Sequence, residues 1–440
     1  MTILKIFQPA DPGYARDIEA LRTRLHGGGL VAADAGNLDV PKIVADILKQ
    51  VREGGDAAAA RLTSQFDQAD LTTERLRVSQ DEIDRALKQA DQQFLTLIRK
   101  AIRNIRDYQE HILIKAPPAL QRGGRQLGVR YLPLDRVAVY VPGGQALYPS
   151  TVLMTVVPAQ VAGVKEVILL SPPKGGDINP LVLALAGELR IKEVYRLGGA
   201  VAVAAAAFGT ATIRPVDKIV GPGNAFVAEA KRQLFGRVGI DSIAGPSEVL
   251  IIADDTANPD WVAADLLAQA EHNPGSALLI TPSSQLAETV AAVVDRQLAQ
   301  LQRADITRPS MEQYSAVIVV RDLAAACELA NRFATEHLQI MTADDESCLK
   351  KIRHAGAIFI GAHTPVPLGD YYAGPSHVLP TGGTARFFGP LSCNDFLKAS
   401  SIIRYDAKSL AEDAGSVSEF AEREGLTAHA RAVTIRKESM

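Results

Sequence analysis

The sequence predicts an α/β fold with two lobes, each built on a parallel sheet. From Arg136 onward, short apolar runs of strand length alternate with helical segments, and the same alternation starts again at Val249. Such alternation is typical of parallel sheets, because a helix must carry the chain back before the next parallel strand begins. A length of 440 residues also exceeds what one core usually supports, which favours two or three cooperating units.

The N-terminal third of the chain predicts helices. Residues 1–28 are expected to form a short helical arm, and residues 40–112 repeat apolar side chains at the helical period with charges on the opposite face. We expect residues 29–135 to form the first lobe together with residues 247–388. The chain would cross back to that lobe at residues 241–246.

The alternating part of the chain predicts the remaining elements. In residues 136–246, the second lobe, the expected strands are 137–141, 166–170 and 193–196, with helices between them. After the crossing, the expected strands are 249–252, 277–280 and 316–320, and the expected helices start at Pro259, at Gln285 and after Asp322. We expect residues 389–440 to form a charged, helical tail. This tail is too small for a core of its own and should therefore pack on a neighbouring domain or subunit.

Composition excludes several classes of protein. The 47 basic and 50 acidic residues nearly balance and form no basic run, so a nucleic-acid partner is not expected. The three cysteines lack the spacing of a thiolate metal site or a disulfide framework, which favours a reducing compartment. Charged and proline residues interrupt the N-terminus, and the uncharged stretch 137–164 is interrupted by residues that include Pro142, Gly143, Gly144, Pro149 and Pro158. We therefore expect a cytoplasmic protein without an export signal or a membrane span.

Gln269 and His272 are the first candidate metal ligands. Asn258 can cap a helix that starts at Pro259 and stops before Pro274, which places the two side chains one turn apart on one face. That spacing can hold one metal ion. A surface glutamine beside a histidine at a helix end, stabilised by the helix dipole, is the alternative.

Glu336 and His337 are the candidate acid–base pair. They lie where a helix runs directly into an apparent strand at residues 338–341. At such a junction both side chains can face the cleft above the sheet, a usual site of catalysis in open α/β folds. A carboxylate beside an imidazole offers two bases of different strength. The alternative is a helix-end ion pair with the neighbouring Arg332.

Two further segments contain candidate ligands. The Gly- and Pro-rich segment 367–383 includes Asp370, which could add a carboxylate oxygen to a metal held by Gln269 and His272, and also His377. A plain turn around Asp370 is the alternative. Near the C-terminus, Glu424 and His429 are five residues apart, so they share no helical face and could converge only through a bend at Gly425.

Glycine-rich turns after two expected strands predict a nucleotide site. The segments Tyr140-Val-Pro-Gly-Gly and Gly-Pro-Gly-Asn224 each join a strand to a helix, whose first amides can bind phosphate. Ala-Gly-Pro-Ser247, before another strand, is ambiguous, and all three can be simple tight turns. The full G-x-G-x-x-G fingerprint is absent, so a dinucleotide would not use that phosphate turn.

Taken together, these segments resemble the histidinol dehydrogenase family, in the same order from about residue 15 to the end. The resemblance rests on the combination Tyr-Val-Pro-Gly-Gly, Gly-Pro-Gly-Asn-Ala-Phe-Val, Ala-Gly-Pro-Ser-Glu-Val-Leu, Leu-Leu-Ala-Gln-Ala-Glu-His, Ala-Thr-Glu-His-Leu, Gly-Asp-Tyr, Ser-His-Val-Leu-Pro-Thr and Glu-Gly-Leu-Thr-Ala-His. It implies two incomplete Rossmann-like lobes in an intertwined homodimer that exchanges an N-terminal arm and a C-terminal tail. It also implies the last step of histidine biosynthesis, oxidation of L-histidinol to L-histidine through an aldehyde with two NAD.

The resemblance implies a role for each candidate. One Zn²⁺ per subunit would be held by Gln269, His272, Asp370 and the partner's His429, and would orient the substrate rather than activate water. His337 would take the hydroxyl proton, and Glu336 would activate water in the second step. The resemblance further implies that the zinc ligands and His337 also contact substrate. It implies the same of Ser247, Glu424 and His377, and that Tyr140 and Asn224 line the NAD site.

Three positions depart from the family pattern. Val201 stands where the family usually has a Gln that touches NAD, so a polar cofactor contact is expected to be missing. Gln145 replaces a common Lys, and Ser376 replaces a common Asn. These departures suggest altered NAD affinity or specificity, while every expected zinc ligand and both catalytic residues are present.

Three other readings of the sequence remain open. A paralogue could oxidise another small alcohol with the same zinc and the same Glu-His pair, although Ser247 and Glu424 argue against this reading. A homodimer in which zinc only joins the tail to the partner would not need Glu336 and His337. A nucleotide-binding regulator would rest on glycine turns alone, which are common in proteins.

Overall fold

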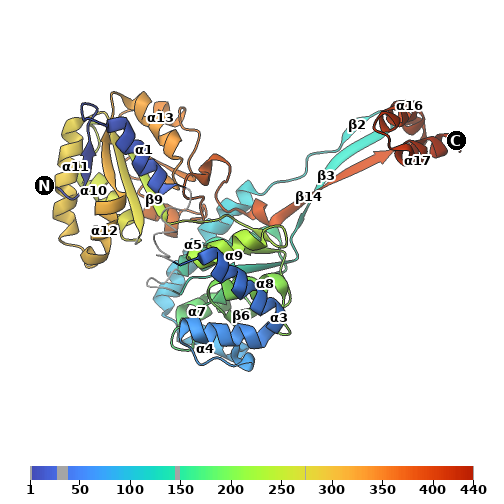
Figure 1. The fold of residues 1–440 in the computed structure, drawn as a ribbon, viewed down its shortest axis with the longest axis horizontal. Helices are drawn as coiled ribbons and strands as arrows, with labels where there is room; N and C mark the ends of the chain where they lie inside the picture. The colour runs from blue at the N-terminus through green and yellow to red at the C-terminus, as the bar shows by residue number, and fades with distance from the viewer. Residues whose placement is uncertain (1, 27–37, 144–148, 273, 440) are drawn as a thin grey trace.

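The computed structural model describes residues 2–26, 38–143, 149–272 and 274–439. Two parallel sheets with helices around them lie side by side, and a long two-stranded arm extends away from them to the C-terminal helices (Figure 1). The α/β class with parallel sheets is confirmed. Within the described residues, no helix is both long and apolar enough to cross a membrane.

The larger sheet has six parallel strands in the order β1-β11-β10-β9-β12-β13. Its strands are β1 (Lys5–Phe7), β9 (Ser247–Ala253), β10 (Gly275–Thr281), β11 (Ala316–Val319), β12 (His337–Met341) and β13 (Ala357–Ile360). The helices on it are α1 (Tyr14–Leu25), α10 (Pro259–Ala270), α11 (Ser284–Leu298), α12 (Ala304–Tyr314), α13 (Leu323–Phe333), α14 (Asp345–Leu349) and α15 (Val366–Tyr371). The central strands are apolar and buried on both faces, as a sheet covered by helices requires.

The smaller sheet has five parallel strands in the order β6-β5-β4-β7-β8. These are β4 (Arg136–Tyr140), β5 (Glu166–Ser171), β6 (Glu193–Arg196), β7 (Lys218–Val220) and β8 (Gly239–Ile240). The helices on it are α3 (Val40–Asp67), α4 (Gln80–Gln89), α5 (Gln92–Ile112), α6 (Pro149–Ala162), α7 (Pro180–Glu188), α8 (Gly199–Phe208) and α9 (Ala225–Leu234), and a short 3-10 turn, η1 (Thr73–Arg75), joins α3 to α4.

The assignment of residues 29–135 to the lobe of residues 247–388 is wrong. Val44 and Val51 of α3 share a core with Ala138 and Tyr140 of β4, and Ile98 of α5 packs into the other face of the same sheet. The helices of residues 40–112 therefore cover the five-stranded sheet. Their apolar stripe showed that one face is buried, but a stripe carries no information about which sheet buries it.

Residues 1–28 were expected to form a separate helical arm, and the structure differs. Lys5–Phe7 forms β1 at the edge of the six-stranded sheet, with Ile6 level with Val317. Helix α1 then packs on the same sheet, where Ile18, Leu21 and Leu25 are buried. The described residues 2–26 thus belong to this chain's own larger lobe, because β1 covers the backbone edge of β11.

The extended arm is built on a long pair of antiparallel strands that are far apart in the sequence. Strand β3 (Arg125–Pro133) pairs along its whole length with β14 (Leu397–Tyr405), and β2 (Leu120–Arg122) pairs with β3. Helices α16 (Ala407–Arg423) and α17 (Thr427–Glu438) pack on each other at the tip, while the 3-10 turns η2 (Thr384–Arg386) and η3 (Cys393–Phe396) precede β14. The expectation of an entirely helical tail is therefore wrong for residues 397–405.

Candidate functional site

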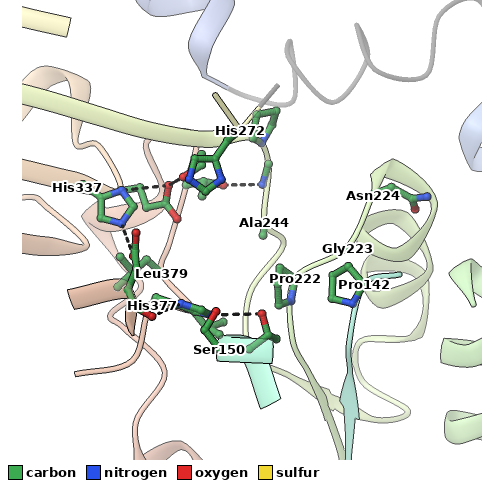
Figure 2. Close-up of a pocket in the computed structure, with 18 of the residues that line it drawn as sticks. Pro142, Ser150, Pro222, Gly223, Asn224, Ala244, His272, His337, His377 and Leu379 are labelled. Carbon is green, nitrogen blue, oxygen red and sulfur yellow. Dashed lines mark hydrogen bonds and ion pairs between the residues drawn. The ribbon is translucent and has the colours of Figure 1, made fainter. Parts of the chain in front are cut away.

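A cleft of ≈ 450 Å³ lies between the two sheets and is lined by residues from both. The six-stranded sheet contributes the amino ends of β9 and β12, where Ser247 and His337 lie. The five-stranded sheet contributes the turns after the carboxyl ends of β4 and β7, which include Pro142 and Asn224. In Figure 2, His272, His337 and His377 lie on one side of the cleft and Asn224 on the other.

Glu336 and His337 start a strand rather than end a helix. Helix α13 stops at Phe333, Ala334 takes a left-handed conformation with φ 49°, and β12 begins at His337. The pair therefore lies at the amino edge of its sheet. Both residues line the cleft that they were expected to face, and the five-stranded sheet meets that cleft at its carboxyl edge.

The Glu336 carboxylate is fixed by two donors from β9. Ser247 Oγ donates to Glu336 Oε2 at 2.5 Å, and the backbone N–H of Glu248 donates to the same oxygen at 2.8 Å. Burial raises the pKa of Glu336 although these hydrogen bonds and the neighbouring His337 oppose the rise. The side chain is thus a stronger base than an exposed glutamate.

The His337 ring is oriented by a backbone carbonyl. Its Nδ1 lies 2.9 Å from the carbonyl oxygen of Glu248, so in the neutral ring Nδ1 carries the proton that is donated there and Nε2 is the acceptor. Nε2 is buried, has no hydrogen-bond partner among the described residues and lies 3.7 Å from Asp370 Oδ1. Burial works against protonation, but the charges of Glu336 and Asp370 outweigh it and raise the pKa of His337 to about 9.

Sequence reasoning missed Glu248, which supports both members of the pair. Its side chain is buried, and its carboxyl oxygens accept hydrogen bonds from the backbone N–H of Gly382 at 3.1 Å and of Glu336 at 3.4 Å. Burial and the Glu336 charge raise the pKa of Glu248 to about 8, so it is largely protonated at neutral pH. A glutamate directly before the apolar run 249–253 was the available signal.

Three of the predicted metal ligands come from the same lobe. Gln269, in the last turn of α10, is buried, and its Nε2 has no hydrogen-bond partner among the described residues. His272 follows the helix end at Ala270 and lines the cleft, as does Asp370 in the short helix α15. Gln269 is thus helical and His272 is not, although one helix was expected to carry both.

Within the described part of the chain, no three His, Cys, Asp or Glu side chains form a cluster suited to a metal ion. Among the predicted ligands, only His272 and Asp370 are residues of these four types that come from the same chain. The other predicted ligands are an amide and a histidine of a second chain. The two findings are therefore compatible, and the ligand set stays a prediction.

His377 lies in the cleft wall, and Ser376 does not. His377 Nδ1 is 3.0 Å from the carbonyl oxygen of Asp370, and Nε2 is 3.4 Å from Thr151 Oγ1. Burial lowers the pKa of His377. Ser376 is buried and donates to the carbonyl oxygen of Met154, so this departure from the family pattern serves local packing.

The residues predicted to bind NAD have different surroundings. Asn224 lines the cleft while its side chain caps α9. Tyr140 is buried behind the glycine turn, and its hydroxyl accepts a hydrogen bond of 3.1 Å from the N–H of Gly199. Val201 is buried in the adjoining apolar core. Gln145 lies outside the described residues.

Glu424 and His429 are far from the cleft of their own chain. Both are exposed, at the end of α16 and in α17 respectively, at the tip of the arm (Figure 1). Neither belongs to the cleft lining. If either residue takes part in the site, it must reach the cleft of another subunit.

A family model described as histidinol dehydrogenase matches residues 32–437. The chain belongs to the histidinol dehydrogenase family. Histidinol dehydrogenases are NAD-dependent oxidoreductases, so this protein is an enzyme of that class. The resemblance found in the sequence motifs is thereby confirmed.

Individual histidinol dehydrogenases support the assignment along the whole chain. The protein of Rhodopirellula baltica is 48% identical over 98% of this chain and 96% of its own length. That of Bacillus subtilis is 48% identical over 92% of this chain and 95% of its own length. The crystal structure of histidinol dehydrogenase from Elizabethkingia anophelis matches with a TM-score of 0.91 and 34% identity, covering 100% of this chain and 99% of the other.

Proposed function

We propose that the protein oxidises L-histidinol to L-histidine in two steps, with one zinc ion per site and two NAD. The observation that carries this proposal is the pairing of two bases at one cleft, the buried Glu336 carboxylate and the free Nε2 of His337. The alcohol must lose its hydroxyl proton as hydride leaves, and water must lose a proton as it hydrates the aldehyde, so two separate bases suit the two steps.

In the first step His337 Nε2 takes the proton of the substrate hydroxyl. Because Nδ1 is held by the Glu248 carbonyl, the ring can neither rotate nor change tautomer without losing that hydrogen bond. The carbon loses a hydride to the first NAD⁺ and becomes an aldehyde. The cleft retains the aldehyde for the second step.

In the second step Glu336 takes a proton from water as the oxygen attacks the aldehyde carbon. The resulting hydrate anion would lose a hydride to the second NAD⁺ to give the carboxylic acid, which releases its proton to become the carboxylate. Ser247 Oγ and the N–H of Glu248 hold the carboxylate of Glu336 in place, which reduces the cost of ordering it during the reaction.

The residues of the cleft fit a zinc ion. Gln269 Nε2 and His337 Nε2 are buried without a hydrogen-bond partner among the described residues, and Asp370 Oδ1 lies 3.7 Å from His337 Nε2. His272 lines the same cleft. Gln269, His272 and Asp370 would hold the ion with a fourth ligand. When bound, zinc would orient the amine and imidazole of the substrate and would offset the Asp370 charge that raises the pKa of His337.

The fourth ligand, His429, would come from the partner subunit of a homodimer. The arm holds it far from its own cleft, and the helices at the tip expose Phe420, Leu426 and Ile435. Exposed apolar side chains on a projecting pair of helices support burial against a second copy. The same docking would bring Glu424 to the substrate.

NAD would bind where the strand order of the five-stranded sheet reverses. If its five strands are numbered as they occur along the chain, their order across the sheet is 3-2-1-4-5, so β4 and β7 flank the switch point. The switch point is the usual place for dinucleotides in Rossmann-like folds. The turns after these two strands contribute Pro142, Gly223 and Asn224 to the cleft. Tyr140 lies beneath the turn that follows β4 and would affect NAD binding through its hydrogen bond with the N–H of Gly199.

The first test is the number of NADH formed per L-histidinol consumed. We expect two NADH with zinc-loaded protein, none after chelation, and a slowed second step in Glu336→Gln, which keeps the shape of the side chain. Glu346→Gln, an exposed change in α14, is the control. No NADH from histidinol, with oxidation of another small alcohol, would instead favour a repurposed paralogue.

A further inference from the structure

A buried polar pair lies behind the cleft, between α10 and β12. Gln339 of β12 is fully buried, and its Nε2 donates to Asp265 Oδ2 of α10 at 2.9 Å. The surrounding side chains of both elements form an apolar core. Neither Asp265 nor Gln339 lines the cleft, and the proposed reaction steps use neither.

Regular secondary structure places each member of the pair beside a residue of the site. Asp265 and Gln269 are four residues apart in α10, so their side chains lie one turn apart on the same face of the helix. Gln339 and His337 are two residues apart in β12, so their side chains point to the same face of the sheet. The hydrogen bond therefore joins the helix of a predicted zinc ligand to the strand of a predicted base.

Two polar atoms near the pair lack partners. Gln269 Nε2 and Gln339 Oε1 are buried and form no hydrogen bond with any described residue. A metal binds a side-chain amide through its oxygen, because the amide nitrogen only donates. A ligating glutamine therefore turns its N–H groups away from the metal, and in a buried site these groups need an acceptor.

The Asp265 carboxylate suits the role of that acceptor. Burial raises the pKa of Asp265 to about 6, although the hydrogen bond from Gln339 opposes the rise, so the carboxylate is largely ionised at neutral pH. Gln339 binds one of its two oxygens, Oδ2. An ionised carboxylate can accept several hydrogen bonds, which leaves capacity for a second donor.

We propose that Asp265, held in place by Gln339, orients the side-chain amide of Gln269 so that the amide oxygen faces the metal. Asp265 accepts an N–H of Gln269 and touches neither metal nor substrate, so it is a positioning residue. Such outer partners fix the orientation of a metal ligand and strengthen it as a donor. The inference rests on the proposed function only in taking Gln269 as a zinc ligand.

The first test measures zinc affinity of the full-length protein by competition with a chromophoric chelator, without turnover. We expect Asp265→Ala to weaken zinc binding by about 10- to 100-fold, the usual effect of losing an outer partner of a ligand. Asp260→Ala removes an exposed carboxylate from the first turn of the same helix and should bind zinc as wild type does. Wild-type zinc affinity in Asp265→Ala would overturn the proposal.

A double variant separates orientation from packing. Asp265→Leu with Gln339→Leu replaces both partners of the hydrogen bond by apolar side chains, so the zinc-free protein should melt close to the wild-type temperature. Its zinc affinity should nevertheless fall as far as that of Asp265→Ala. The role is only structural if the double variant binds zinc like wild type, or if zinc affinity falls only where the zinc-free protein also melts earlier.

Gln269→Ala shows whether Asp265 acts through Gln269. If it does, Asp265→Ala should add little to the loss of zinc affinity that Gln269→Ala causes, and additive losses would overturn the proposal. Unchanged zinc affinity in Gln269→Ala itself would reject Gln269 as a ligand and so the proposed zinc site. Weaker binding in Gln269→Ala but not in Asp265→Ala would reject the positioning role alone.

Discussion

The hydroxyl of Ser247 donates to Glu336 Oε2 at 2.5 Å and joins the amino end of β9 to the amino end of β12. The two residues are 89 positions apart in the sequence. They meet because β9 and β12 are neighbours at the point where the strand order of the six-stranded sheet reverses. The position of the Glu336 carboxylate thus depends on a residue from another strand.

We expect Ser247→Ala to slow the aldehyde step more than the alcohol step. Loss of a hydrogen bond to a carboxylate should lower the rate of aldehyde oxidation by about 10- to 100-fold, because Glu336 loses its orientation. Single-turnover rates with histidinol and with the aldehyde measure the two steps separately. Ser276→Ala, a buried change on the adjacent strand, is the control, and equal slowing of both steps would refute the link to Glu336.

We expect Asp370→Asn to weaken zinc binding by at least about 100-fold, since the loss of an outer-shell partner alone typically costs 10- to 100-fold. Competition with a chromophoric chelator measures the affinity without any need for turnover. Asp344→Asn removes an exposed carboxylate that caps α14 and should leave zinc affinity unchanged. Equal affinities in wild type and Asp370→Asn would remove Asp370 from the ligand set.

Mixed dimers test the origin of His429. One subunit carries Glu336→Gln and the other His429→Ala. If His429 acts across the interface, one of the two sites keeps both residues, and the purified heterodimer retains about half of the wild-type activity. If His429 serves its own chain, each site has one defect and activity stays at the level of the two mutant homodimers.

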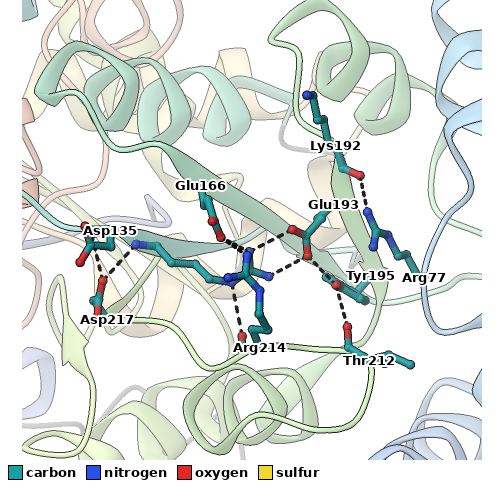
Figure 3. A network of polar contacts seen from close by, with 10 residues as sticks. Arg77, Asp135, Glu166, Lys192, Glu193, Tyr195, Thr212, Arg214 and Asp217 are labelled. Atoms are coloured by element: carbon teal, nitrogen blue, oxygen red, sulfur yellow. Dashed lines mark hydrogen bonds and ion pairs between the residues drawn. The ribbon is translucent and has the colours of Figure 1, made fainter.

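The ion-pair network at the amino end of the five-stranded sheet should be a major source of stability. Arg136 is buried and donates to Glu193 at 2.9 and 2.7 Å and to Glu166 at 2.6 Å, and Tyr195 also donates to Glu193 (Figure 3). We expect Glu193→Gln to cost about 3 kcal/mol, because it leaves a buried guanidinium poorly paired. Glu188→Gln, which breaks a partly exposed pair with Arg99, should cost about 1 kcal/mol or less.

Because of the same network, the stability of the fold should depend on pH. The hydrogen bonds from Arg136 lower the pKa of Glu193 to about 2, below its usual value of 4.5. A lowered pKa of a carboxyl stabilises the fold above the unfolded pKa, and that contribution is lost as the pH falls from about 4.5 towards 2. The melting temperatures of wild type and Glu193→Gln should therefore converge in acid. A difference in melting temperature that stays constant down to pH 2.5 would contradict this cause.

The sequence alone determined the local elements and the family. Asn258 and Pro259 start α10 as expected, and the apolar runs at 137–141 and 249–252 form buried strands. Capping side chains, prolines and runs of apolar residues act within a few residues of one another, so the sequence displays their effect directly. The motifs that contain Gln269, Glu336 and Asp370 likewise indicated the family without any knowledge of the fold.

Only the tertiary structure decided which elements meet. It moved the helices of residues 40–112 to the five-stranded sheet, made β1 an edge strand, and placed His429 far from its own cleft. It also brought Glu248 to Glu336 and His337 at the amino edge of β9 and β12. An apolar pattern shows that a face is buried, but its partner is chosen by strand order and packing between segments far apart in the chain, which no local pattern records.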